Sequence, residues 1–234
     1  MHHRFFVDGP LLSQESIDLK GDELHHATRV VRLREGEEVE LFDGRGNAVS
    51  GRLVILTRDR ATVQITGAAP SREPAIRITL AMSIIQLEKF ELVLQKAVEL
   101  GASAILPMRT DRCEVREERY RGKGERWRKI LLEAAKQSGR SVVPELLPEL
   151  SFDEVAGSSG EKIVFDAEAD PSPSSSLGGA VRVLIGPEGG WSPREQALAA
   201  EMGCRFERLG PRRLRAETAA MAAIVLITAR AGDI

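Results

Sequence analysis

The 234-residue sequence lacks the features that would assign it to several common classes of protein. It contains no run of eighteen apolar residues, so we expect no membrane-spanning segment. The first residues, MHHRFFVDGP, carry no long apolar stretch and no small-residue cleavage site, which argues against a signal peptide. The two cysteines, Cys113 and Cys204, match no metal-ligand spacing, so we expect reduced thiols in a cytoplasmic protein and no bound metal.

The sequence also lacks a strong excess of charge and the usual phosphate-binding motifs. Its net charge is −2, which excludes a uniformly basic nucleic-acid-binding protein. It contains neither GxGxxG nor Gly-Lys-Ser/Thr, so a dinucleotide-dependent dehydrogenase is the weakest functional reading.

Positive charge is nevertheless concentrated in two segments. Between Arg109 and Arg140 eleven Lys or Arg residues occur against six Asp or Glu, and between Arg205 and Arg215 five Arg occur against one Glu. Solvated faces would account for such runs, since charge runs usually are solvated. The alternative is a confined basic surface suited to a structured RNA.

Two patterns meet near residue 70 and predict two domains, 1–70 and 75–234. Residues 37–68 read as short strands separated by turns, and the preceding segment 22–32 has helical spacing that lets Leu24, Ala27 and Val31 share a face. A small β-barrel carrying one helix is the natural assembly of these elements. The segment AAPSREPA, with two prolines, then predicts a linker.

After the linker, strands alternate with helices, which predicts an α/β fold with a parallel sheet covered on both faces. In the helix over 87–100 the apolar positions Phe90, Val93, Leu94, Ala97 and Val98 share the inward face. The expected strands are 75–84, 103–108, 162–167, 181–186 and 206–210; the other expected helices are 124–139, 192–203 and 217–232, and 172–179 is expected to be a loop.

Two of these strands end in unusual loops, and ligands of open parallel sheets bind beyond such strand ends. The first loop, in LIGPEGG at 184–190, leads into a helix that Ser192 and Glu195 can cap. The second, in LGPRRLRAETAA at 209–220, brings three arginines to the start of an apolar helix. A glycine-rich turn and a helix start are often only structural, but clustered arginines beside a buried helix suggest an anionic ligand or RNA.

Together these two motifs resemble the signature of the SPOUT methyltransferase superfamily, and more narrowly that of the 16S ribosomal RNA uridine-N3 methyltransferases. The similarity extends to LEKFELVLQKAVELGAS, QSGRSVVPEL and HHATRVVRLREGEEVELFDG, and so covers nearly the whole chain. It implies an N-terminal PUA-like β-barrel, a C-terminal SPOUT-type α/β domain with a trefoil knot, and a homodimer. Arg213 departs from the pattern, because the family more often has an aliphatic residue there.

The resemblance also implies where S-adenosyl-L-methionine and RNA bind. The two loops, with a third wall after the strand KIVFDA, would hold the cofactor; 16S ribosomal RNA or the small ribosomal subunit would be the partner. The expected cofactor-binding residues are Phe165, Asp166, Ile185, Gly186, Pro187, Glu188, Gly189, Gly190, Leu209, Gly210, Leu214, Arg215 and Ala219. The expected RNA-binding residues are Arg4, Arg29, Arg32, Arg112, Arg116, Gln137 and Arg140.

The chemistry of methylation at N3 points to two candidate catalytic residues. Uridine N3 carries a proton, so a base or a cation that stabilises the uridine anion is needed. Glu217 is the candidate base and Arg215 the candidate for stabilising the anion, although Glu217 would also suit a helix start. Two alternatives stay open: a sister SPOUT enzyme that methylates a ribose 2′-oxygen, and a non-catalytic RNA-binding protein.

Overall fold

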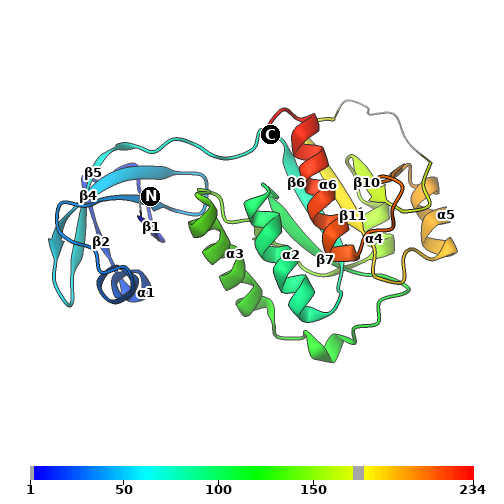
Figure 1. The fold of residues 1–234 in the computed structure, drawn as a ribbon, viewed down its shortest axis with the longest axis horizontal. Coiled ribbons are helices and arrows are strands. Elements are labelled where there is room, and N and C mark those ends of the chain that lie inside the picture. The colour runs from blue at the N-terminus through cyan, green and yellow to red at the C-terminus, as the bar shows by residue number, and fades with distance from the viewer. Residues whose placement is uncertain (1–2, 171–176) are drawn as a thin grey trace. The chain divides into compact units, whose positions relative to one another are not determined.

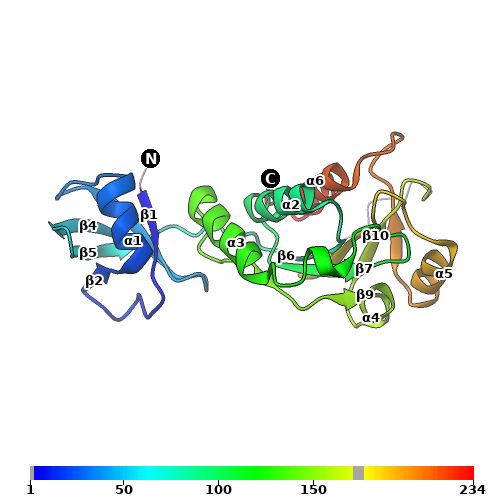
Figure 2. The ribbon, with the colours of Figure 1, turned by 90° about the horizontal axis from the view of Figure 1, so that it is seen from below.

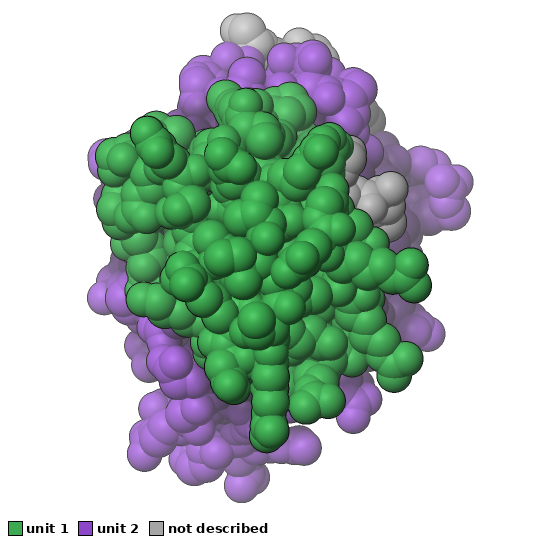
Figure 3. All heavy atoms as spheres, turned by 90° about the vertical axis from the view of Figure 1, so that its left-hand side faces the viewer, with its two compact units in different colours: residues 1–73, 135–143 green, residues 74–134, 144–234 purple. Residues whose placement is uncertain are grey.

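The computed structural model describes residues 3–170 and 177–234 and divides the chain into two compact units. Unit 1 comprises residues 1–73 and 135–143, and unit 2 comprises residues 74–134 and 144–234; Figure 3 colours them separately. The first segment of unit 1 ends three residues beyond the expected boundary at residue 70. Residues 135–143, which we expected in the larger domain, belong to unit 1. Most of the loop expected at 172–179 lies outside the described residues.

Unit 1 is built on a curled five-stranded sheet (Figure 1). Strand β1 pairs in parallel with β3, whereas the other neighbours are antiparallel. Its buried core includes Phe5, Leu41, Leu53 and Val63. In sheet order the strands are β1 (His3–Phe6), β3 (Glu38–Phe42), β4 (Ala48–Leu56), β5 (Ala61–Ala68) and β2 (Ser16–Leu19).

The helix expected near residues 22–32 is present but is not a uniform α-helix. Helix α1 (Gly21–His25) continues as a π-helical turn, η1 (His26–Val30). Ala27 is fully buried, and Leu24 and Val31 pack against the same core, which confirms the predicted inward face. Such π-helical segments often occur at functional sites.

Unit 2 contains a sheet in which all pairings between described strands are parallel, as predicted. Strand β10 lies between β11 and β12, so the chain crosses over β10 after β11 and adds β12 on the far side. The strands in sheet order are β12 (Arg205–Glu207), β10 (Lys162–Phe165), β11 (Ala180–Ile185), β6 (Arg77–Ser83), β7 (Ala104–Arg109) and β8 (Glu145–Leu146), and β9 (Leu150–Ser151) also pairs with β7.

Helices cover both faces of this sheet (Figure 2). Helices α2 (Leu87–Glu99) and α6 (Ala216–Arg230) pack together on one face, and α4 (Phe152–Gly157) and α5 (Pro193–Glu201) pack on the other. Helix α3 (Gly124–Ser138) follows the short helix η2 (Glu117–Arg119), and its last residues, from Ala135, belong to unit 1. None of the described helices is long and apolar enough to cross a membrane.

Two local predictions are confirmed by these helices. The five inward positions expected in α2 are its buried residues. At the start of α5, the Ser192 hydroxyl accepts a hydrogen bond from the Glu195 amide (3.1 Å), and Glu195 Oε2 accepts one from the Ser192 amide (2.8 Å). This capping box fixes where the chain enters α5 immediately after the glycine-rich loop. The trefoil knot itself stays an expectation from the resemblance.

Candidate functional site

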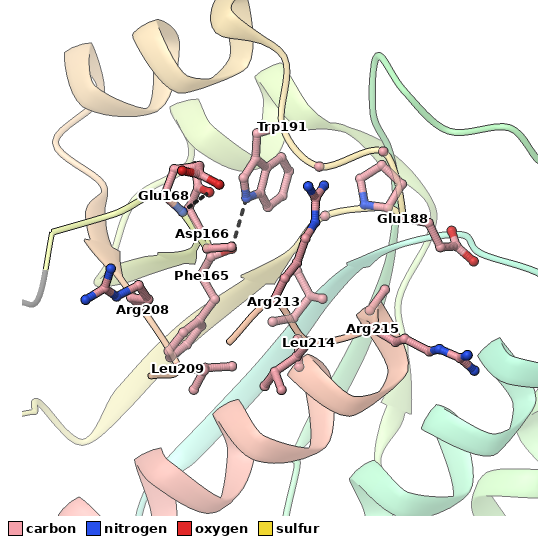
Figure 4. A pocket seen from close by; sticks show the side chains of 18 of the residues that line it. Phe165, Asp166, Glu168, Glu188, Trp191, Arg208, Leu209, Arg213, Leu214 and Arg215 are labelled. Atoms are coloured by element: carbon pink, nitrogen blue, oxygen red, sulfur yellow. Dashed lines mark hydrogen bonds between the residues drawn. The ribbon is translucent and has the colours of Figure 1, made fainter. Parts of the chain in front are cut away.

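Three loops meet at one edge of the sheet and enclose a cavity of about 490 Å³ (Figure 4). They follow β10, β11 and β12, which are neighbouring parallel strands whose carboxyl ends lie at the same edge. The chain therefore places the cavity where parallel sheets bind ligands. Its volume lies within the range of small-molecule binding sites, about 300–1,000 Å³.

The cavity brings together nearly all of the residues that we expected to bind the cofactor. Phe165 ends β10 and Asp166 follows it, Ile185 ends β11 and Pro187 through Gly190 lie in the loop after it together with Gly186, and Leu209, Leu214, Arg215 and Ala219 come from the chain after β12. Gly210 does not line the cavity. Its φ of +90° identifies it as a turn residue, and a Cβ there would meet no atom within 4 Å.

Trp191 also lines the cavity, although the sequence analysis did not single it out. Its indole Nε1 donates a hydrogen bond to the Phe165 carbonyl oxygen (3.0 Å), so it joins the β10 and β11 loops. The ring packs so closely on Gly186 that a Cβ there would lie 3.1 Å from the indole. Other lining residues that we did not expect are Ala167, Glu168, Gln196, Arg208, Arg212, Arg213 and Ala216, together with Arg112, which we had assigned to RNA.

The glycine-rich loop is a tight turn. The Gly190 amide donates a hydrogen bond to the Pro187 carbonyl oxygen (2.9 Å), and Gly190 has a φ of +69°, which glycine adopts without the strain of a side chain. The absence of a side chain at Gly190 lets a ligand approach the backbone there, whereas a Cβ on Gly189 would meet Arg112.

A fourth loop, after β7, holds the glycine-rich loop from outside. The Asp111 carboxylate accepts hydrogen bonds from the Ser192 hydroxyl and from Arg194 (Nη2, 2.8 Å). These bonds, that from Arg194 above all, hold the pKa of Asp111 below its ordinary value. The Asp111 amide donates to Glu195 Oε1 (2.9 Å), and Arg112 Nη1 donates to the Gly189 carbonyl oxygen (2.9 Å). The start of α5 and the turn before it are thus fixed together.

Charges of both signs line the cavity. Asp166 and Glu168 follow β10; Asp166 accepts hydrogen bonds from Gln196 Nε2 (2.7 Å) and from the Glu168 amide (3.0 Å). The Glu188 side chain points away from the cavity (Figure 4) and forms an ion pair with Lys89 (3.7 Å). The cavity can therefore bind a ligand that itself carries both charges. Its arginines are Arg112, Arg208, Arg212, Arg213 and Arg215.

The two candidate catalytic residues lie differently with respect to the cavity. Arg215 lines it and is the N-cap residue of α6, and its side chain points outward on the side of Glu188 (Figure 4). Glu217, in the first turn of α6, is not a lining residue. Its Oε2 is buried and forms no hydrogen bond with any residue that the structure describes.

Among the expected RNA-binding residues, Arg4 and Arg140 are buried in unit 1. The Arg140 side chain, 5% exposed, forms an ion pair with Glu73 (2.7 Å), and that of Arg4, 8% exposed, pairs with Glu40 (2.8 Å). Arg4 also donates to the Arg140 carbonyl oxygen (3.0 Å), so this network fastens residues 135–143 to the barrel. Burial leaves neither guanidinium free for a phosphate, which argues against direct RNA contact. The exposed candidates are Arg29, Arg32, Arg112, Arg116 and Gln137, of which Arg112 also lines the cavity.

The described residues contain no group of three or more His, Cys, Asp or Glu side chains that could hold a metal ion. Cys113 and Cys204 are free thiols. Cys204 is buried, and burial raises its pKa.

Two family models match the chain. A model described as RNA methyltransferase domain matches residues 71–228, and one described as RNA methyltransferase PUA domain matches residues 19–66. The chain is 31% identical to the ribosomal RNA small subunit methyltransferase E of Synechocystis, over 98% of this chain and 78% of that protein. The chain belongs to the ribosomal RNA small subunit methyltransferase E family. The Bacillus subtilis member is 29% identical, with 96% of this chain and 95% of that protein covered.

Solved structures of two relatives have the same fold over 98% of both chains. The family member of Neisseria gonorrhoeae, bound to S-adenosylmethionine, aligns with a TM-score of 0.90 and 34% identity. A methyltransferase of Legionella pneumophila, in complex with the same cofactor, aligns with a TM-score of 0.86 and 30% identity. These matches confirm the predicted fold class, a PUA-like domain followed by a SPOUT-like α/β domain.

Proposed function

We propose that this protein transfers a methyl group from S-adenosylmethionine to N3 of a uridine in 16S ribosomal RNA. The observation that carries the proposal is the convergence of three strand-end loops on one cavity in a chain of this family. The two relatives whose solved structures hold S-adenosylmethionine support the choice of cofactor.

The residues of the cavity fit that cofactor. Phe165, Ile185, Leu209 and Leu214 supply an apolar lining for an adenine ring, and the turn at Gly189–Gly190 presents backbone without side chains. Asp166 and Glu168 offer carboxylates that complement positive charge, and arginines line the remainder. When bound, S-adenosylmethionine supplies a methyl group on a sulfonium, already activated for in-line displacement.

The protein itself must position the uridine and promote loss of its N3 proton. Arg215 points out of the cavity beside Glu188, so we place the uridine on that side, with the guanidinium stabilising negative charge as it develops at O2 or O4. Glu217 is the proposed base. Its buried Oε2, without a hydrogen-bond donor among the described residues, is an acceptor that a proton would satisfy.

We assign RNA recognition to both units. In unit 1 the exposed Arg29 and Arg32 flank the end of the π-helical turn within the segment matched by the PUA model. In unit 2 the exposed Arg116 follows the loop that carries Arg112. Because N3 lies on the pairing edge of uridine, the target must be unpaired or flipped out of a helix.

We also propose a cytoplasmic homodimer that uses the faces of α2 and α6. Leu92 of α2 is 41% exposed and Val225 of α6 is 38% exposed, on two helices that pack against each other. Burial of these side chains against a second copy would remove apolar surface from water. Light scattering at micromolar concentration should give twice the chain mass; a monomer would contradict this part of the proposal.

One experiment tests the proposed reaction. The protein is incubated with methyl-labelled S-adenosylmethionine and either naked 16S ribosomal RNA or the small ribosomal subunit, and the RNA is then digested to nucleosides. Labelled N3-methyluridine is the expected product. Labelled 2′-O-methyluridine would favour the ribose-methylating alternative, and RNA binding without label would favour a non-catalytic protein.

A further inference from the structure

Arg213 occupies an unusual place in the cavity. Figure 4 shows its side chain standing across the cavity, from the loop after β12 toward the glycine-rich loop, whereas Arg208 and Arg215 point away to either side. Its Nη2 lies 3.7 Å from the position that a Cβ on Gly190 would take. The Arg213 guanidinium therefore lies next to the glycine-rich loop, on the side of the cavity opposite the Arg213 backbone.

The guanidinium of Arg213 has no partner in the part of the chain that the structure describes: it forms no hydrogen bond and no ion pair there. This is notable because Asp166, Glu168 and Glu188 line the same cavity. Asp166 is satisfied by Gln196 and the Glu168 amide, and Glu188 by Lys89. The cavity therefore keeps the two-pronged guanidinium donor group available beside the backbone of Gly190.

The chemistry of such a group selects its ligand. A guanidinium presents two parallel N–H donors that match the two oxygens of a carboxylate. A ligand with both signs of charge, as S-adenosylmethionine has, would place positive groups near Asp166 and Glu168 and its carboxylate near Arg213. An RNA phosphate is a poorer fit, because the acidic residues of the same cavity would repel it.

We propose that Arg213 binds the carboxylate of the cofactor's amino-acid end and so determines which sulfonium ligands the cavity accepts. This inference rests on the proposed function. It makes Arg213 a specificity-determining residue, distinct from Arg215 on the uridine side.

A pair of ligands that differ only in the carboxylate tests the assignment. Calorimetry compares S-adenosylmethionine with decarboxylated S-adenosylmethionine, for the wild type and for Arg213→Leu. The variant should bind S-adenosylmethionine about 10- to 100-fold more weakly, as expected for loss of a charge-assisted hydrogen bond. Its affinity for the decarboxylated ligand should be unchanged or higher, since a positive charge has been removed near a cationic ligand.

Arg121→Leu is the matched control. Arg121 is exposed, pairs with Glu117 and lines no part of the cavity. The Arg121→Leu substitution should leave the affinities for S-adenosylmethionine and for its decarboxylated form unchanged. Thermal denaturation should show that both Arg121→Leu and Arg213→Leu fold.

Two results would overturn the inference: equal weakening of both ligands by Arg213→Leu, or no weakening of either. Unchanged cofactor affinity with reduced RNA affinity would assign Arg213 to the RNA backbone instead. If the wild type binds neither ligand, the proposed function fails, and the assignment of Arg213 fails with it.

Discussion

Arg112 Nη1 donates a hydrogen bond of 2.9 Å to the carbonyl oxygen of Gly189, across 77 residues of sequence. A Cβ on Gly189 would lie 3.2 Å from the Cβ of Arg112, so the two loops are also in close contact. The arginine that we expected to contact RNA is therefore placed to hold the cofactor loop.

Replacement of Arg112 by leucine should weaken cofactor binding. The Gly189 carbonyl would lose its donor, and the turn at Gly190 would lose its support from the β7 side. We expect a rise in the cofactor Kd of about 5- to 20-fold, in the range of one charge-assisted hydrogen bond. Calorimetry without RNA measures the cofactor Kd. The control is Arg119→Leu, because Arg119 is exposed and lines no part of the cavity. Unchanged cofactor affinity with weaker RNA binding would return Arg112 to an RNA-contact role.

Gly186→Ala should disturb the cavity through Trp191. The new Cβ would lie 3.1–3.3 Å from three indole atoms, and the indole is tied to the Phe165 carbonyl oxygen. We expect a loss of stability of about 1–3 kcal/mol, as for overpacking in a well-packed region, together with weaker cofactor binding. Thermal denaturation and calorimetry measure the two effects. Gly179→Ala is the control, because a Cβ there meets no atom within 4 Å.

Much of this site follows from local sequence rules, because the rules act over a few residues. The capping box of Ser192 and Glu195 and the glycine-rich turn before it depend on neighbours in the chain, and so does the inward face of α2. The alternation of strands and helices then brings the loop ends together at one edge of a parallel sheet.

The features of the site that the sequence did not predict depend on contacts between residues far apart in the sequence. No local pattern distinguishes Arg112, which donates a hydrogen bond to the Gly189 carbonyl oxygen, from Arg116, four residues later, although both are exposed. Likewise, Arg140 belongs to a basic run of the sequence, but in the structure it is buried and donates a hydrogen bond to the Glu73 carboxylate, 67 residues away. Trp191 had a signal that could have been used: an aromatic residue directly after two glycines at a strand end.

Arg140→Leu should destabilise unit 1 and not merely weaken RNA binding. Its guanidinium donates twice to Glu73 Oε2, at 3.0 and 2.7 Å, while Glu73 Oε1 accepts from the amides of Ser141 and Val142. Loss of one partner of a buried ion pair costs about 3–5 kcal/mol, because the other charge stays buried. Chemical denaturation should show the loss. A stable variant that binds RNA poorly would instead support direct contact with RNA.

Arg29 and Arg32 should contribute to RNA affinity without affecting the cofactor. Both are exposed, and Arg32 is the only non-glycine residue with positive φ (57°) among the described residues. A non-glycine residue in this conformation is uncommon and often marks a functional segment. The double variant Arg29→Ala/Arg32→Ala should bind 16S ribosomal RNA more weakly, and its salt dependence should fall by about two units of log–log slope. Cofactor affinity should be unchanged. Unaltered RNA affinity would make this segment purely structural.

Arg215 and Glu217 should affect methyl transfer in different ways. If Arg215 stabilises the uridine anion, its interaction strengthens only as charge develops, so Arg215→Ala should lower the single-turnover rate more than it weakens either substrate. We expect the single-turnover rate of Arg215→Ala to fall about 100-fold or more, comparable to removal of a hydrogen-bond donor from an oxyanion site. Arg215→Lys, which keeps the charge, should recover part of it.

Glu217 is tested by the pH dependence of the same rate. Because N3 must lose a proton, the wild-type single-turnover rate should rise toward alkaline pH. Glu217→Gln cannot accept that proton, so it should flatten the pH profile while RNA and cofactor binding survive. A residue that only stabilises the start of α6 would behave differently: the variant would lose thermal stability and keep the wild-type profile. Wild-type rates at every pH for Glu217→Gln would exclude the base role and leave Arg215, or the RNA itself, to promote loss of the N3 proton.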